Sequence, residues 1–256
     1  TGRPIVLSLS YGPMPLAGAD HLATNANMWR LLGDLWDYWE DVRPAFRQLH
    51  EWTRFAGPGH WPDPDMLPIG RLRALPAGWS KNVTMNPGYF AMVSHGGRED
   101  VANFLSRDEQ RTVMTLWAAA RAPLMVGGHL PASDAWTLSL LTNAGVLAVN
   151  QASRGNRQLF HANGLAAWTA EDPATGARYV AVFNAADPDG RGNAAGIAVP
   201  VRLADLGLTG PAAVTDVWTG RPAGVATGEF APVVPYHGAG LYRLDPAGRA
   251  KAGPRS

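Results

Sequence analysis

Residues 1–155 alternate four times between a short apolar run and a segment with helical periodicity. This alternation is typical of parallel strands joined by crossover helices, because each helix returns the chain to the same end of the sheet. Four such units cannot close a barrel, which needs eight strand–helix units and about 250 residues. The alternation therefore predicts either a small open α/β sheet or one half of a (β/α)8 barrel.

The strands and helices of this region can be assigned from their patterns. The expected strands are four apolar runs, Pro4–Ser10, Trp29–Asp34, Asp65–Gly70 and Pro123–Gly128. The clearest helix begins at Ser106, which forms a capping box with Glu109. Its buried stripe is expected to contain Val113, Leu116, Trp117 and Ala120. A second helix, between Trp36 and Phe55, contains Pro44, which must start a new turn or kink it.

Helical periodicity ends near Asn156. The following region contains short strand-like runs divided by Gly, Pro, Asn and Asp, namely LAAWTAE, RYVAVFNA, GIAVPVRL, AVTDVWTG and GAGLYRLDP. Regularly spaced short strands with such turns predict an antiparallel β-sandwich. We therefore divide the chain into an α/β part (residues 1–155), a sandwich (residues 156–247) and a tail expected to be disordered (residues 248–256).

Composition excludes several classes of protein. The 256 residues include 22 basic and 21 acidic side chains, so their formal charge of +1 does not indicate binding to nucleic acid or to an anionic membrane. No apolar run approaches the ~20 residues that span a bilayer, and the first residues lack the pattern of a signal peptide. The chain has no cysteine, which excludes disulfides and thiolate metal sites.

Polar side chains gather near the C-terminal ends of the expected strands. Ser10 ends the first strand, and Arg30 and Asp34 lie on the second. Asp63 and Asp65 stand at the third. Barrel enzymes and open α/β sheets both place their sites at this edge. A carboxyl near an arginine has a tunable pKa, and a second carboxylate across a pocket would complete the pair that glycoside hydrolysis uses.

The stretch GHWPDPDMLPIG, from Gly59 to Gly70, allows three interpretations. It could be a surface turn, a metal site that includes His60, or the floor of an active site. For Asp63 a structural turn is favoured over chemistry, and no further ligand cluster supports a metal. Similarly, Asp34 could be only the N-cap of the following helix, with Arg30 as its buried ion-pair partner.

Five sequence blocks in order resemble the melibiase-type α-galactosidases, glycoside hydrolase family 27. The blocks are GRPIVLSLS, NMWRLLGDLWDYW, AGPGHWPDPDML, LWAAARAPLMVGG and VLAVNQ, and they run from about Thr1 to Gln151. The strand-rich region after them is similar to the family's C-terminal domain, including VPYHGAGLYRL near its end. The resemblance implies the second half of a TIM barrel followed by an antiparallel β-sandwich, and a retaining glycosidase that needs no cofactor or metal.

The resemblance also implies roles for individual residues. The family's Trp-Arg pair, followed four residues later by Asp, falls on Trp29, Arg30 and Asp34. Asp34 would thus be the general acid/base, and Arg30 would bind a sugar hydroxyl beside it.

The third strand carries the other implied site residues. Its loop, the stretch GHWPDPDMLPIG, would belong to the seventh barrel strand and form part of the active site. Asp65 and Met66 would line or brace the pocket, and Trp61 would offer a face for sugar stacking or for packing.

Two departures from the family pattern limit what the resemblance implies. The nucleophile's strand is absent, because the chain begins at what would be the fifth strand. We therefore expect the fragment alone to be inactive and to expose two open sheet edges. Ser10 stands where many galactose-specific relatives carry Glu, so we expect it to bind substrate but to leave the sugar open.

The substrate and the class of function thus have alternatives. An α-galactoside is the default substrate, and α-N-acetylgalactosaminidase, β-L-arabinopyranosidase and isomaltodextranase are alternatives within the family. A non-catalytic carbohydrate-binding protein is the alternative of a different class. The expected partner is a carbohydrate, and neither nucleic acid nor a membrane. The oligomeric state and the compartment stay open, although secretion of the full-length parent would fit a polysaccharide-degrading enzyme.

Overall fold

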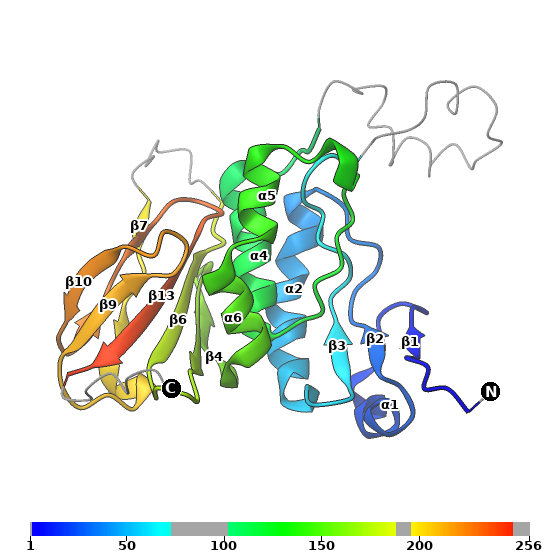
Figure 1. The fold of residues 1–256 in the computed structure, drawn as a ribbon, viewed down its shortest axis with the longest axis horizontal. Helices are drawn as coiled ribbons and strands as arrows, with labels where there is room; N and C mark the ends of the chain where they lie inside the picture. The colour runs from blue at the N-terminus through cyan, green and yellow to red at the C-terminus, as the bar shows by residue number, and fades with distance from the viewer. Residues whose placement is uncertain (1, 73–101, 188–195, 248–256) are drawn as a thin grey trace, which may run out of the picture.

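The computed structural model describes residues 2–72, 102–187 and 196–247. Three short strands, β1 (Ser8–Leu9), β2 (Met28–Arg30) and β3 (Trp61–Asp63), form a parallel sheet in chain order (Figure 1). A parallel bridge between Leu67 and Val126 adds the fourth strand position. The predicted order of four parallel strands is confirmed.

Helices α2 (Trp39–Trp52), α4 (Arg107–Ala120) and α6 (Ala144–Ala152) lie between the parallel sheet and the sandwich (Figure 1). The other α-helices are α1 (Ala19–Asn25), at the foot of β1 and β2 in Figure 1, and α5 (Ala135–Leu141). The 3-10 helices are η1 (Leu16–Gly18), η2 (Thr53–Phe55), η5 (Leu130–Ala132) and, within the sandwich, η6 (Leu203–Leu206). The expected capping box of α4 is present, and α2 continues through Pro44. Within the described ranges, no helix is long and apolar enough to cross a membrane.

Three of the predicted strands were placed wrongly. The strand after α2 is Trp61–Asp63 and not Asp65–Gly70, because Asp65 has a φ of 90°, which no extended strand allows. The second strand ends at Arg30, and residues 31–34 form a loop. The first strand is only two residues long, Ser8–Leu9 instead of Pro4–Ser10, and the apolar residues before it are exposed.

Both outer strand positions of the parallel sheet expose apolar side chains. Beside β1, Ile5 is 71% exposed and Val6 is 69% exposed. Met125 and Val126 are exposed at the opposite side. Among the described residues, β1 pairs only with β2, and Val126 bridges only to Leu67. These are the two open edges expected of a half barrel.

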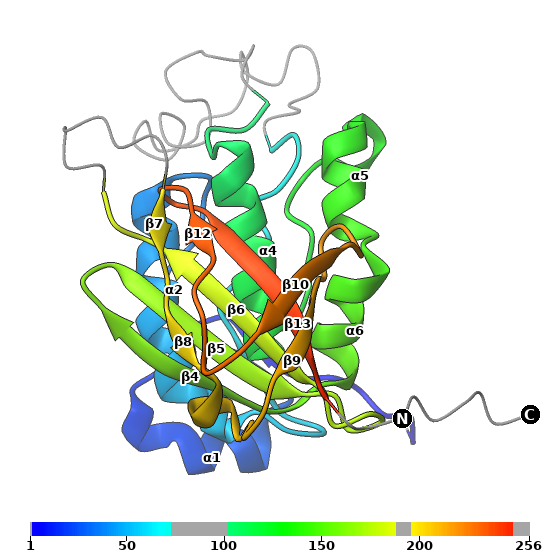
Figure 2. The same ribbon diagram turned by 90° about the vertical axis from the view of Figure 1, so that its left-hand side faces the viewer.

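The sandwich consists of one large sheet and two small strand pairs. The large antiparallel sheet has the order β10-β9-β13-β6-β5-β4. Its strands are β4 (Arg154–Ala162), β5 (Leu165–Glu171), β6 (Arg178–Asn184), β9 (Ala212–Asp216), β10 (Pro222–Ala226) and β13 (Ala239–Pro246). The small pairs are β7 (Ile197–Ala198) with β12 (Val233–Val234), and β8 (Val201–Arg202) with β11 (Glu229–Phe230). They cross in front of the large sheet in Figure 2.

One hydrophobic core joins the helices to the large sheet. Phe46 of α2 contacts Phe183 of β6 with ring centroids 5.3 Å apart, and Trp117 of α4 and Trp168 of β5 are fully buried in the same cluster. A second core fills the space between the large sheet and the small pairs. The sheet therefore buries one face against the helices and the other within the sandwich.

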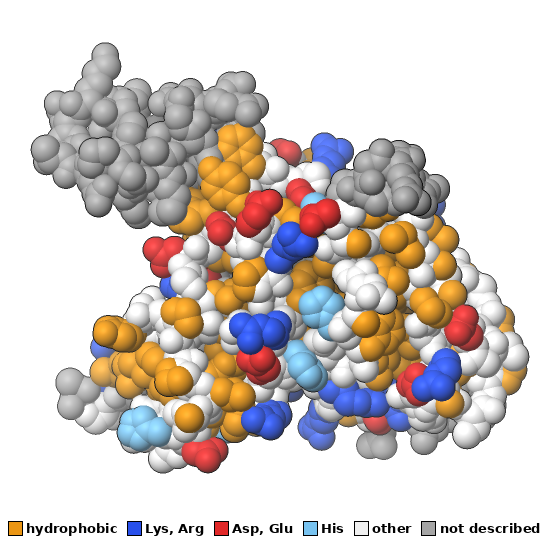
Figure 3. Space-filling model, turned by 180° about the vertical axis from the view of Figure 1, so that it is seen from behind, with side chains coloured by type: hydrophobic (Ala, Val, Ile, Leu, Met, Phe, Trp, Pro, Cys, Tyr) orange, Lys and Arg blue, Asp and Glu red, His pale blue; other side chains and the backbone are white. Residues whose placement is uncertain are grey.

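The predicted sandwich strands agree with the structure in most places. LAAWTAE is β5, whereas the run GIAVPVRL is divided into β7 and β8 around Pro200, which has no N–H to donate to a ladder. The predicted division at residue 155 falls inside β4, a strand that the sequence did not indicate. The tail 248–256 lies outside the described residues. Positive and negative side chains are mixed on the face shown in Figure 3, consistent with the small net charge.

Candidate active site

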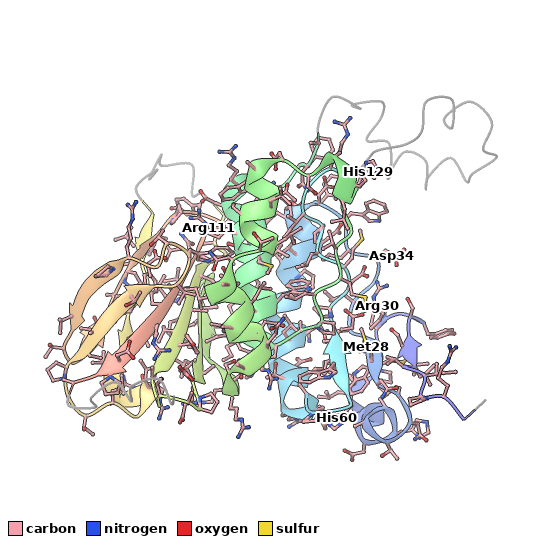
Figure 4. All side chains as sticks on the ribbon, viewed as in Figure 1. Met28, Arg30, Asp34, His60, Arg111 and His129 are labelled. Carbon is pink, nitrogen blue, oxygen red and sulfur yellow. The ribbon has the colours of Figure 1, made fainter. Side chains whose placement is uncertain are left out.

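Four polar residues lie at the C-terminal ends of neighbouring parallel strands. Ser10 follows β1, and Arg30 is the last residue of β2. Asp34 lies in the loop after β2, and Asp65 follows β3 by two residues. Figure 4 shows Arg30 and Asp34 together at this end of the sheet. The parallel order of the strands is thus what brings these side chains to one edge.

Arg30 is the centre of this cluster and is only 8% exposed. Its Nη2 lies 2.9 Å from Asp65 Oδ2 and 3.3 Å from Asp34 Oδ1. The same nitrogen donates to the carbonyl oxygen of Gly33 at 2.6 Å, and Nη1 donates to Ser10 Oγ at 3.3 Å. Because the guanidinium is a rigid fork of donors, it fixes the relative positions of three strand ends.

Asp65 is held at several atoms besides its ion pair with Arg30. Its Oδ2 accepts the backbone N–H of Leu35 at 2.7 Å, next to Asp34 in the chain. Its own N–H donates to Asp63 Oδ1 at 2.9 Å, and its carbonyl oxygen accepts the indole N–H of Trp117 at 3.1 Å. These contacts hold a backbone φ of 90°, which is uncommon outside glycine and is typical of functional sites.

Asp63, the last residue of β3, accepts a hydrogen bond from the backbone of Asp65 in the following loop. Asp63 is 7% exposed, and burial raises the pKa of its carboxyl, although the hydrogen bond from Asp65 N–H opposes that rise. The structure gives Asp63 the role of an acceptor in a turn, which was the favoured interpretation of its sequence.

Asp34 is the exposed member of the cluster. Its side chain is 73% exposed and touches Arg30. The alternative reading of Asp34 as a helix N-cap is wrong, because α2 begins at Trp39 and its N-cap is Tyr38. Asp34 therefore presents a carboxylate to solvent beside a buried cation.

The structure does not bring Trp61 to this cluster. Trp61 is the first residue of β3 and lies at the opposite end of that strand, next to His60, which Figure 4 shows at the foot of the sheet. The guanidinium of Arg121 lies over its ring, 5.0 Å from the centroid. The expectation that Trp61 stands in the active-site loop was wrong because the strand begins four residues earlier than predicted.

Met66 lies next to the cluster around Arg30, whereas His60 lies at the other end of β3. A Cβ on Gly127 would lie 2.4 Å from Met66 Sδ, so Met66 packs between the third and fourth strand positions, next to Asp65. The metal-site interpretation combines His60 with Asp63 and Asp65. His60 precedes β3, whereas Asp63 ends it and Asp65 follows it, so roughly 10 Å of strand separate His60 from the nearer aspartate. No cluster of three His, Asp or Glu side chains that could hold a metal occurs in the described ranges.

The supporting contacts of Asp65 were not predicted. Trp117 was recognised only as part of the buried stripe of α4, and the acceptor for Leu35 N–H was not identified. The Pro-Asp-Pro-Asp spacing next to an apolar run was the only sequence signal that these aspartates have unusual neighbours.

Comparison with known proteins shows two matching families. Residues 1–85 match the model described as "Alpha galactosidase A", and residues 162–244 match "Alpha galactosidase C-terminal beta sandwich domain". The α-galactosidase of Oryza sativa subsp. japonica is 28% identical over 224 residues, covering 86% of this chain and 44% of the relative. The α-N-acetylgalactosaminidase of Homo sapiens is 30% identical over 160 residues, covering 59% of this chain and 31% of the relative.

A solved structure supports the same fold over nearly the whole chain. The β-L-arabinopyranosidase of Geobacillus stearothermophilus is 40% identical, with a TM-score of 0.82 and coverage of 97% of this chain and 52% of that chain. The predicted fold class, a partial TIM barrel followed by an antiparallel β-sandwich, is confirmed. The chain spans about half the length of the α-galactosidase from Oryza sativa and of this solved structure.

Proposed function

We propose, from the premise that this chain belongs to the α-galactosidase-like glycoside hydrolase family 27, that it forms part of a retaining glycosidase. The observation that carries the proposal is the pairing of an exposed carboxylate, Asp34, with the buried guanidinium of Arg30 at the C-terminal edge of the parallel strands. This edge is where barrel enzymes place their catalytic residues.

Asp34 is the general acid/base in the proposed reaction. A carboxylate from the remaining half of the barrel attacks the anomeric carbon, while Asp34 protonates the leaving glycosidic oxygen. Asp34 then removes a proton from water, which hydrolyses the glycosyl-enzyme ester and restores both carboxyl groups. In the complete enzyme the two carboxyl groups should lie about 5–5.5 Å apart, the separation typical of retaining enzymes.

The other residues of the cluster bind the sugar or hold the loop of Asp34 in place. Arg30 donates to a hydroxyl of the sugar and also anchors the strand ends through Ser10 and Asp65. Asp65 holds the loop that carries Asp34 through Leu35 N–H, and Met66, which packs next to Gly127, would line the sugar site beside it. Ser10, which is exposed after β1 and accepts a hydrogen bond from Arg30, would contact the same sugar.

An α-galactoside is the proposed substrate, and a β-L-arabinopyranoside is the second candidate. The 40% identity to the Geobacillus stearothermophilus β-L-arabinopyranosidase over 97% of this chain is the observation that supports this second candidate. The two sugars share the configuration of the ring and differ in the hydroxymethyl group on C5. A side chain that contacts C5 would therefore decide between them.

The proposal is tested in the full-length protein that contains this chain. Wild type should hydrolyse an aryl α-galactoside or an aryl β-L-arabinopyranoside, and the ratio of the two kcat/KM values assigns the sugar. Asp34→Asn should lower turnover of an α-galactosyl disaccharide by roughly 10²–10⁴-fold, the usual contribution of a general acid, and partly spare aryl substrates with good leaving groups.

Asp20→Asn is the matched control, because Asp20 is an exposed aspartate in the first turn of α1 and should leave turnover unchanged. Full activity of Asp34→Asn on the disaccharide would refute the assignment of Asp34. A wild-type protein that binds the sugars without hydrolysing either one would instead be a carbohydrate-binding protein.

A further inference from the structure

One turn of the sandwich reaches across to the helices, and His237 lies at its tip, between β12 and β13. The Nδ1 of His237 lies 2.7 Å from Glu109 Oε1 of α4. Its ring stacks on the ring of Trp39 in α2, with centroids 4.1 Å apart and an interplanar angle of 16°. A single imidazole thus contacts the first turn of two helices.

The backbone and neighbours of His237 strengthen this contact. The carbonyl oxygen of His237 accepts the hydroxyl of Thr112 in α4 at 2.6 Å. Its Nε2 lies 3.4 Å from Asp187 Oδ1, and Asp187 also pairs with Arg43 of α2 at 2.8 Å. His237 has a φ of 54°, so its left-handed backbone conformation is what aims both the ring and the carbonyl at the helices.

His237 contacts the residues that begin α4 and α2. Glu109 uses its second oxygen, Oε2, to accept Ser106 N–H at 2.7 Å in the capping box of α4. Trp39 is the first residue of α2, and that helix has no side-chain cap at its N-terminus. The stacked imidazole thus adds to the Tyr38–Phe104 ring pair and the hydrogen bond from Trp36 N–H to Asp41, which also hold the start of α2.

The start of α2 in turn adjoins the loop of the candidate acid/base. Asp34 precedes Trp39 by five residues. Two hydrogen bonds hold the segment between Asp34 and Trp39. Leu35 N–H donates to Asp65 near its start, and the buried Asp37 accepts Phe104 N–H at 2.8 Å in its middle. His237 holds the far end through Trp39.

We propose that His237 is a positioning residue by which the sandwich fixes the start of α2 and, with it, the loop that carries Asp34. The consequence for catalysis rests on the proposed function of Asp34, whereas the effect on the loop does not. The sandwich then contributes to the geometry of the active-site edge, beyond any part in binding carbohydrate.

The test is hydrogen–deuterium exchange of the full chain carrying His237→Gly or His237→Asn. Glycine adopts the same backbone φ without strain and keeps the carbonyl that Thr112 uses, so this substitution removes only the imidazole. We expect amides of residues 34–42 to exchange about tenfold faster in His237→Gly, while β9 and β10 stay at wild-type rates. His237→Asn should restore part of the protection, because Asn tolerates this φ and can donate to Glu109.

Asn163→Gly is the matched control, since Asn163 also has a positive φ, 52°, but lies in the exposed turn between β4 and β5. It should leave residues 34–42 unchanged. The proposal is overturned if His237→Gly leaves exchange of residues 34–42 at the wild-type rate, or if it raises exchange equally along the chain.

The full-length enzyme supplies a second readout. There, His237→Gly should lower kcat about tenfold with KM changed less than twofold, and His237→Asn should recover part of kcat. Unchanged kcat would overturn the catalytic consequence alone. An enzyme that shows no activity at all would refute the proposed function, while the exchange experiment would still decide the role of His237.

Discussion

Substitution of Asp65 by Asn should destabilise the chain by about 2 kcal/mol, the usual range for a hydrogen bond to a charged group being ~1.5–3 kcal/mol. The Arg30–Asp65 contact is 2.9 Å long, and the two side chains are only 10% and 16% exposed. Solvent therefore screens this pair weakly. Asn keeps an oxygen that can accept Leu35 N–H and tolerates the positive φ, so the lost ion pair dominates the effect.

Two further variants separate the contacts of Asp65. Asp65→Ala also removes the acceptor of Leu35 N–H, and a buried N–H without a partner costs about 1–3 kcal/mol more. Asp34→Asn removes a 3.3 Å contact of a side chain that is 73% exposed, which should cost no more than about 0.5 kcal/mol. The expected order of destabilisation is Asp65→Ala, then Asp65→Asn, then Asp34→Asn.

The measurement is urea-induced unfolding of the purified chain, followed by tryptophan fluorescence, for the three variants and wild type. A double-mutant cycle of Asp65→Asn with Arg30→Met isolates the ion pair and should give a coupling of ~1–3 kcal/mol. Equal destabilisation by Asp34→Asn and Asp65→Asn would refute the reasoning. A coupling energy near zero would show that Arg30 is held by its other partners, the Gly33 carbonyl oxygen, Ser10 and Asp34.

Three other predictions follow from the same structure. Because burial raises the pKa of Asp63, its ionised form destabilises the folded chain, so Asp63→Asn should gain stability relative to wild type at pH 7 and lose that gain in acid as the wild-type carboxyl protonates. Burial raises the pKa of Asp172, but hydrogen bonds from Arg243 and Thr175 outweigh it and lower the pKa overall. Asp172→Asn should therefore destabilise at pH 7 by about 1–2 kcal/mol and progressively less as the pH falls through that lowered pKa, as urea unfolding at several pH values would show. A Cβ on Gly128 would lie 2.2 Å from a backbone carbonyl oxygen, so Gly128→Ala should lower the thermal midpoint more than Gly127→Ala, whose clash is chiefly with a flexible methionine.

Each of these predictions has a contrary outcome. A constant difference between Asp63→Asn and wild type from pH 3 to 7 would show that the carboxyl does not titrate differently on folding. An Asp172→Asn effect that persists unchanged in acid would assign the loss to packing. Equal thermal midpoints for the two glycine variants would mean that the strand at Gly128 can move away from its neighbour.

Much of the fold could be predicted from local patterns. The capping box at Ser106 and the buried stripe of α4 depend on residues three and four apart, which the sequence shows directly. β5 and β6 are apolar runs between turns, and their predicted ends differ from the observed ends by no more than one residue. β4 was missed because it is an edge strand whose first five residues, RGNRQ, are polar or glycine, and because two register shifts interrupt its pairing with β5.

Errors in the parallel strands have a different origin. Apolar runs there were taken to be the strands themselves, yet Leu67 and Ile69 are buried by tertiary packing after the strand has ended. The backbone turns away at Asp65 because the side chain of Asp63 and the indole of Trp117 hold it there. Contacts between residues 52 positions apart cannot be read from a pattern of spacing.

The candidate site shows the same division between local and long-range information. Arg30, Asp34 and Asp65 could be placed at one edge, because parallel strands align their C-terminal ends. The exposure of each carboxylate could not be predicted, because it depends on contacts between different strand ends. Arg30 pairs with both aspartates, but the Asp65 side chain is 16% exposed and that of Asp34 is 73% exposed.

The exposure of Asp34 has a consequence for how the proposed reaction works. A retaining glycosidase needs a nucleophilic carboxylate about 5–5.5 Å from its general acid. The Asp34 side chain is 73% exposed, and the apolar side chains beside β1 are exposed at the open edge of the sheet. Further strands packed against β1 would cover these apolar side chains and would bring their own C-terminal ends to the end of the sheet where Asp34 lies. The hydrolase activity that we propose therefore requires the open edge of β1 to be covered, because those strands would carry the nucleophile.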